Sequence, residues 1–174
     1  MKKFIIIIII IILGTSPFCG CIKKGNGILM IMIKDKPPEL NISKALVTIT
    51  SVSVHRTGLG NNEEDDLSKG WIIIQNESQT FDLIKLQHIT DVLTEVNLDV
   101  GIYSKIRLYV DKAIITIDGV DYDLNIPSKK VKINSNFLIF EEEKTTVLLD
   151  FDIQQSVHKT GNDKFILQPH IKLI

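Results

Sequence analysis

The chain has 174 residues, of which 44% are hydrophobic and 24% charged, and its 20 basic residues nearly balance 21 acidic ones. That balance argues against the strongly basic surface with which proteins bind nucleic acid. The length suits one domain with a single core. The two cysteines, Cys19 and Cys21, both lie near the N-terminus, so the body of the domain must be stabilised by its apolar core without disulfides.

The first twenty residues have the parts of a secretory signal peptide. Lys2 and Lys3 precede ten uninterrupted apolar residues at 4–13, and small residues follow before Pro17. Proline disfavours a helix that would continue far enough to span a bilayer. We therefore predict a cleaved signal peptide over residues 1–20, with an uncleaved N-terminal membrane anchor as the alternative.

Gly20-Cys21 resembles the end of a prokaryotic lipoprotein signal, in which the cysteine becomes the first mature residue and carries the lipid. The sequence departs from that pattern at Phe18 and Cys19, where a leucine and a small residue are usual. We predict lipidation of Cys21 and a short polar tether over residues 21–27. This would attach the protein to the outer face of the cell membrane. The alternative is a plain secretory signal with an incidental thiol.

Strand signals begin after the tether. An apolar run at 28–33 lies between Gly27 and a double proline, and the segment 45–55 is rich in Val, Ile, Thr and Ser. Its apolar alternation changes face around Thr50-Ser51, which predicts a β-bulge there. The segment 71–74 predicts another strand, with the single tryptophan at its start packed into the core.

One segment has a helical period. Within residues 82–96, Leu83, Leu86, Ile89 and Leu93 recur at spacings of three or four. We predict one short helix, or two short turns, in this segment.

The remainder of the chain again predicts strands. Apolar residues alternate from 106 to 117, and Asp118-Gly119 is typical of a tight hairpin turn before a returning strand at 122–126. Further strand signals occur at 131–140, 147–153, 165–167 and 171–173. Many short strands with one helical segment predict an antiparallel β-sandwich over residues 28–174, with a barrel as the alternative.

Several blocks of the sequence resemble the prokaryotic domain of unknown function family 4382. They are residues 45–54, 71, 81–86, 101–108, 126–128, 149–152 and 168–171. The resemblance covers nearly the whole mature chain. It implies a predicted lipoprotein with an immunoglobulin-like or transthyretin-like sandwich. It implies no activity, cofactor or site residue.

The most enzyme-like residues are paired carboxylates. Asp150 and Asp152 alternate with inward-facing apolar residues, so we expect both on one outer strand face, where paired carboxylates can hold a cation or act as acid and base. Arg107 alternates in the same way. We predict that it forms an outward-facing ion pair with one of these aspartates on a neighbouring strand, contributing roughly 0.2 to 1 kcal/mol.

No other motif predicts chemistry. The four histidines are widely separated, and there is neither a nucleophile elbow nor a phosphate-binding loop, so we predict no catalytic residue, metal or cofactor. Asn41 and Asn76 begin Asn-X-Ser sequons, so both are candidate glycosylation sites that should lie on the surface.

Two classes of function follow. We favour a non-enzymatic, membrane-tethered module that binds a surface protein or glycan or contributes to envelope structure. The alternative is an extracellular metal-dependent or hydrolytic enzyme with its site on the Asp150 and Asp152 face. Converging ionisable groups in a cleft would favour the enzyme, and an exposed apolar surface would favour the binding module.

Overall fold

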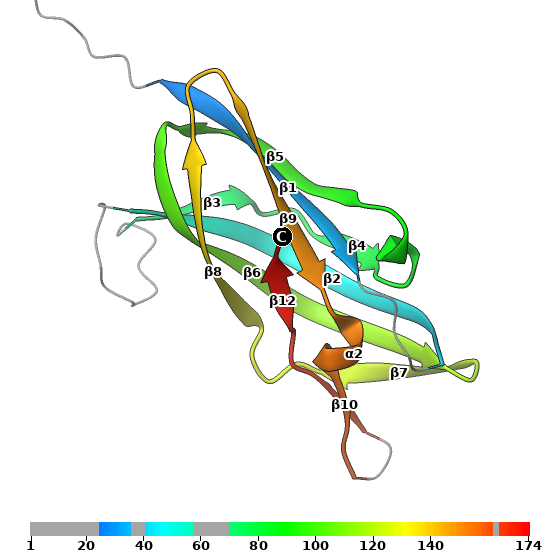
Figure 1. Ribbon diagram of the computed structural model, residues 1–174. Helices are drawn as coiled ribbons and strands as arrows, with labels where there is room; N and C mark the ends of the chain where they lie inside the picture. The colour runs from blue at the N-terminus through cyan, green and yellow to red at the C-terminus, as the bar shows by residue number, and fades with distance from the viewer. Residues whose placement is uncertain (1–24, 36–40, 58–69, 162–163) are drawn as a thin grey trace, which may run out of the picture.

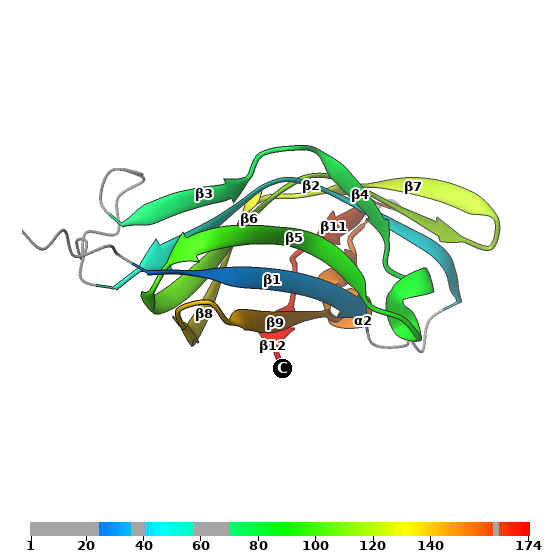
Figure 2. The same cartoon turned by 90° about the horizontal axis from the view of Figure 1, so that it is seen from above.

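The computed structural model describes residues 25–35, 41–57, 70–161 and 164–174, which form two packed β-sheets (Figures 1 and 2). The predicted signal peptide and Cys21 lie outside these described residues. The four-stranded sheet has the order β12-β9-β1-β5. Its strands are β1 (Asn26–Asp35), β5 (Asp91–Asp99), β9 (Lys144–Phe151) and β12 (Ile171–Leu173).

The eight-stranded sheet has the order β10-β11-β7-β6-β2-β3, with β4 paired to β2 and β8 paired to β6. Its strands are β2 (Ile42–Arg56), β3 (Trp71–Gln75), β4 (Gln79–Asp82), β6 (Gly101–Ile117), β7 (Val120–Asn125), β8 (Lys130–Ile139), β10 (Val157–Lys159) and β11 (Phe165–Leu167). A four-residue helix, α2 (Ile153–Ser156), connects β9 to β10.

The prediction of a β-sandwich is confirmed, but the sheets are mixed and not purely antiparallel. β1 pairs with β9 in parallel, and β7 pairs with β11 in parallel. Hairpin signals predict only antiparallel neighbours, whereas these parallel partners are distant in the sequence. The two sheets do not close into a barrel.

The prediction of a helix within residues 82–96 is mostly wrong. A single 3₁₀ turn, η1 (Lys85–Gln87), is followed by strand β5. In the pairing of β5 with β1, Ile31 lies opposite Thr94 and Met32 opposite Val92, so Leu93 is an extra residue in the ladder. This bulge shifts the alternation of β5 by one position and hides its period of two. Ile89, which completed the apparent helical spacing, is 60% exposed, so that spacing did not mark one buried face of a helix.

Two local predictions are confirmed. The pairing of β2 with β6 shifts register between Ile49 and Ser51, where the change of face predicted a bulge. Asp118 and Gly119 have φ values of 50° and 79° and form the tight turn between β6 and β7. Both residues therefore adopt the positive φ that this kind of hairpin turn requires.

The core lies between the inner faces of the two sheets. Alternate residues of β1, β2, β6 and β9 supply most of it, including Leu29, Ile31, Ile33, Val47, Ile49, Ile106, Leu108, Leu149 and Phe151, each at most 1% exposed. Burying one such side chain is worth roughly 1.5–3 kcal/mol. This apolar contact is what holds the two sheets together.

The sandwich has two distinct ends (Figure 1). The Gly25 end is where β1 begins, beside the β5–β6 and β8–β9 turns. The Asp118 end is where β2 begins, beside the β6–β7 turn. β6 runs from one end to the other, and its 17 residues span roughly 50 Å at the usual rise of a strand.

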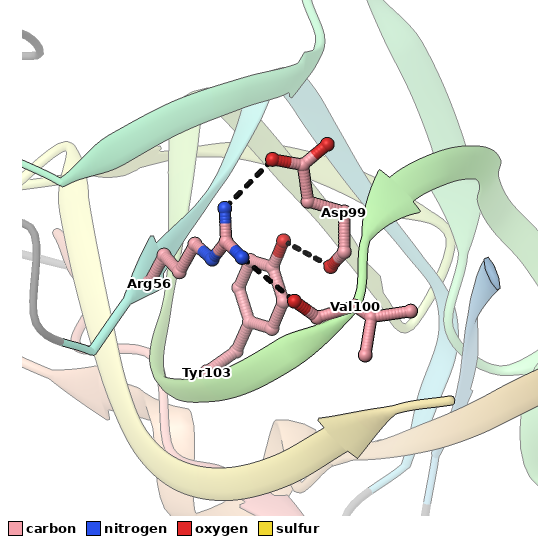
Figure 3. Close-up of polar contacts among 4 residues, drawn as sticks. All are labelled: Arg56, Asp99, Val100 and Tyr103. Atoms are coloured by element: carbon pink, nitrogen blue, oxygen red, sulfur yellow. Dashed lines mark hydrogen bonds and ion pairs between the residues drawn. The ribbon is translucent and has the colours of Figure 1, made fainter. Parts of the chain in front are cut away.

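A polar network joins the two sheets at the Gly25 end (Figure 3). Arg56 of β2 donates to the Asp99 carboxylate and to the Val100 carbonyl, each at 2.7 Å, and the Tyr103 hydroxyl donates to the Asp99 carbonyl at 3.0 Å. Burial raises the pKa of the Tyr103 phenol, with Arg56 lowering it and Asp99 raising it to smaller extents. The network therefore fixes the β5–β6 turn against β2.

Candidate functional site

A ligand-sized cavity among the described residues lies at the Asp118 end. Its volume is about 460 Å³, within the roughly 300–1,000 Å³ range of small-molecule sites. We call it the Asp118 pocket, and it is lined by Asn41, Ile42, Ile117, Asp118, Tyr122, Val157, Lys159 and Phe165. Five of these eight side chains are aliphatic or aromatic.

The pocket borders the hydrophobic core. Ile42 lies opposite Ile117 in the β2–β6 ladder, and both contact the core cluster. The Tyr122 and Phe165 rings meet edge to face, with centroids 4.9 Å apart. The pocket therefore borders the hydrophobic core at one end of the eight-stranded sheet.

Three polar side chains surround this apolar floor. Asn41 and Asp118 are exposed, and Asp118 is held in place by the tight β6–β7 turn. The Lys159 ammonium lies 5.9 Å from the centroid of the Phe165 ring, within cation–π range. A carboxylate, an amide and a cation around an apolar floor can orient a ligand that has an apolar body and a polar end.

Two other cavities differ in chemistry. One, of about 410 Å³, is lined by residues 127–128, 130–132 and 167–169 and contains two lysines. The other, of about 530 Å³, lies along Lys34 and residues 86–90. Neither contains a phenyl or phenol ring, so the Asp118 pocket offers the greater contact area to an apolar ligand.

Asp150 and Asp152 do not share an outer strand face, contrary to the sequence prediction. β9 ends one residue before Asp152, which is the N-cap of α2 and accepts a hydrogen bond from the Gln155 amide at 3.0 Å. Asp152 is only 5% exposed. Asp150 remains on β9, opposite Lys34 of β1 and Lys172 of β12. The two carboxylates therefore have different surroundings.

The prediction of an outward-facing ion pair at Arg107 is also wrong. Arg107 lies in the eight-stranded sheet, whereas Asp150 lies in the four-stranded one. Arg107 is 1% exposed, and its guanidinium carbon is 3.7 Å from the centroid of the Trp71 ring. Alternation indicates which face of a strand Arg107 occupies, but it does not reveal that Trp71, two strands away in the sheet, covers it.

The two sequons have the expected surface positions. Asn41 and Asn76 are both exposed and lie outside the centres of strands. Glycosylation itself stays a prediction. Asn41 also lines the Asp118 pocket, which the sequon alone could not indicate.

Metal ligands do not gather in the part of the chain that the structure describes: no three His, Cys, Asp or Glu side chains there could hold an ion together. His55 instead contacts the Ser104 hydroxyl at 3.2 Å and the edge of the Trp71 ring. Within the same described residues, no helix is long and apolar enough to cross a membrane.

The sequence of the domain matches one known protein family. The profile of the family described as "Domain of unknown function (DUF4382)" matches residues 26–169, which is most of the chain. The chain belongs to the DUF4382 family. The matched range extends from the start of β1 to the segment before β12, so this DUF4382 domain includes both sheets. No curated protein and no solved structure matches the chain.

Proposed function

We propose that this DUF4382 protein is a non-enzymatic binding module, exported and tethered through Cys21 to the outer face of the cell membrane. Its ligand would place an apolar group in the Asp118 pocket. The observation that carries the proposal is the position of that pocket. It lies at the opposite end of β6 from Gly25, where the tether would enter, so a tethered domain would present the pocket away from the membrane.

The chemistry of the pocket supports binding over catalysis. Its floor is made of aliphatic and aromatic side chains, and Asp118 and Lys159 are its charged lining residues. The main enzyme alternative depended on Asp150 and Asp152 acting together. Because Asp152 caps α2, it is poorly suited to work with Asp150 as an acid and base.

The ligand of this module is a surface protein or a glycan. A protein can offer an apolar side chain, and a sugar ring can offer its apolar face to Tyr122. Competition with peptides that carry aliphatic or aromatic side chains, and separately with oligosaccharides, would distinguish them.

The pocket can be tested with anilinonaphthalene sulfonate, a fluorescent probe with an apolar body and an anionic end. We expect the domain without its signal peptide to bind the probe, and Ile117→Trp to weaken binding at least fivefold by filling the pocket. Ile73→Trp is the matched control, because Ile73 is a 48% exposed strand residue of β3 outside the pocket. Equal binding by both variants would contradict a ligand site at the Asp118 end.

A further inference from the structure

A small apolar surface lies at the Gly25 end. Ile102 of β6 lies directly opposite Leu138 of β8, so their side chains share one face of the sheet. Phe140 follows directly after the end of β8, two positions after Leu138, and is also exposed. These three side chains, which we call the Phe140 patch, are 51%, 48% and 51% exposed.

The Phe140 patch lies beside the residues through which the chain enters the domain. The Val100 amide, between β5 and β6, donates to the Gly25 carbonyl at 2.9 Å. On the other side, the Glu142 amide donates to the Asn26 carbonyl at 3.0 Å. Gly25 and Asn26 are therefore hydrogen-bonded to the turns adjoining Ile102 and Phe140.

The chain between this point and the predicted lipid is short. Cys21 and Gly25 are four residues apart, a reach of roughly 14 Å even when fully extended. A lipid on Cys21 would hold the Gly25 end near the membrane interface. We propose that the Phe140 patch docks on the bilayer surface that holds the tether, an inference that rests on the tethering in the proposed function.

The size of the patch favours a bilayer over a second copy of the chain. A stable protein interface buries about 800 Å² on each partner, far more than three half-exposed side chains supply. A bilayer interface has no such requirement, because single aromatic and aliphatic side chains enter the boundary between headgroups and acyl chains.

The charge around the patch indicates which lipid it suits. Glu141, Glu142 and Glu143 are exposed immediately after Phe140. The nearby cation Lys144 is already paired with Glu95 at 3.0 Å. Three carboxylates would be repelled by anionic headgroups. The patch is therefore suited to a surface of neutral headgroups.

The test uses the full-length chain in liposomes of brominated phosphatidylcholine, whose bromine atoms quench nearby tryptophan. Phe140→Trp adds a fluorophore to the patch, and Val120→Trp adds one at the Asp118 end, where Val120 is 52% exposed. The contribution of Trp71 is subtracted using the parent chain. We expect the added fluorescence of Phe140→Trp to fall at least twofold and that of Val120→Trp to be unchanged.

Further arms separate docking from tethering. Adding Leu138→Asp to the Phe140→Trp chain should remove the quenching while the protein still floats with the liposomes. In a separate arm, brominated anionic phosphatidylglycerol should quench the Phe140→Trp chain less than the neutral lipid does. A chain that floats but shows equal quenching at both positions, or none at position 140, contradicts docking alone. A chain that does not float contradicts the tether and the docking together.

Discussion

The two ends of the sandwich are built in opposite ways. At the Gly25 end, Arg56, Asp99 and Tyr103 join the sheets through short polar contacts. At the Asp118 end, side chains of the core cluster line a pocket of about 460 Å³. The contrast teaches that one end of a β-sandwich can be joined by polar contacts between its sheets while the other end keeps a ligand-sized pocket.

Alanine substitutions of two glycines, one at each end, test this contrast. A methyl group on Gly27 would collide with the Phe140 carbonyl oxygen, whereas one on Gly119 would meet nothing within 4 Å. We expect Gly27→Ala to lower the free energy of unfolding by about 3 kcal/mol, because backbone must move. Gly119→Ala should cost about 1 kcal/mol, owing to its φ of 79°. Urea denaturation of both variants measures the difference, and equal losses would contradict it.

The Arg56–Asp99 ion pair at the Gly25 end should contribute more to the free energy of unfolding than an exposed ion pair elsewhere. Arg56→Met removes both hydrogen bonds to the β5–β6 turn, so we expect a loss of about 1 to 2 kcal/mol in the free energy of unfolding. Lys129→Met is the control, because the Lys129–Asp111 pair has the same 2.7 Å separation but is more than half exposed on both sides. Its loss should stay below about 0.5 kcal/mol. If Lys129→Met lost as much stability as Arg56→Met, the expected difference between the two ion pairs would be contradicted.

The smallest expected effect is a pH dependence at Tyr103. Its pKa is raised in the folded protein, mainly by burial, so the folded state holds the phenol proton more tightly than the unfolded chain. The resulting stability is complete below the unfolded pKa of about 10 and is lost as pH rises through the folded value. The stability advantage over Tyr103→Phe should therefore shrink above pH 10. A stability advantage that grows above pH 10 would contradict a raised pKa of Tyr103 in the folded protein.

Local patterns predicted the parts of this fold that depend on local geometry. The Asp118-Gly119 turn follows from the φ values these residues readily adopt, and the bulge near Ser51 follows from the parity of buried residues in β2. β5 could not be recognised in the same way, because the extra residue Leu93 shifts the period of two on which strand recognition depends.

The candidate site was beyond sequence reasoning for a different reason. Its lining residues extend from Asn41 to Phe165 and come from separate strands, so no short motif unites them. Arg107 shows the same limit. Its face was predictable from alternation, but its burial depends on Trp71, which lies on another strand.

The parallel pairing of β1 with β9 has a consequence for the order of folding. Residues 28–35 of β1 pair with residues 144–151 of β9. β1 therefore cannot form this pairing until a strand more than a hundred residues later in the chain has been synthesised. Contacts so distant in sequence slow folding, because a long loop must close before they form. A ribosome or secretion channel that delivers the chain N-terminus first releases β1 long before its partner. The four-stranded sheet can therefore close only after nearly the entire chain has emerged.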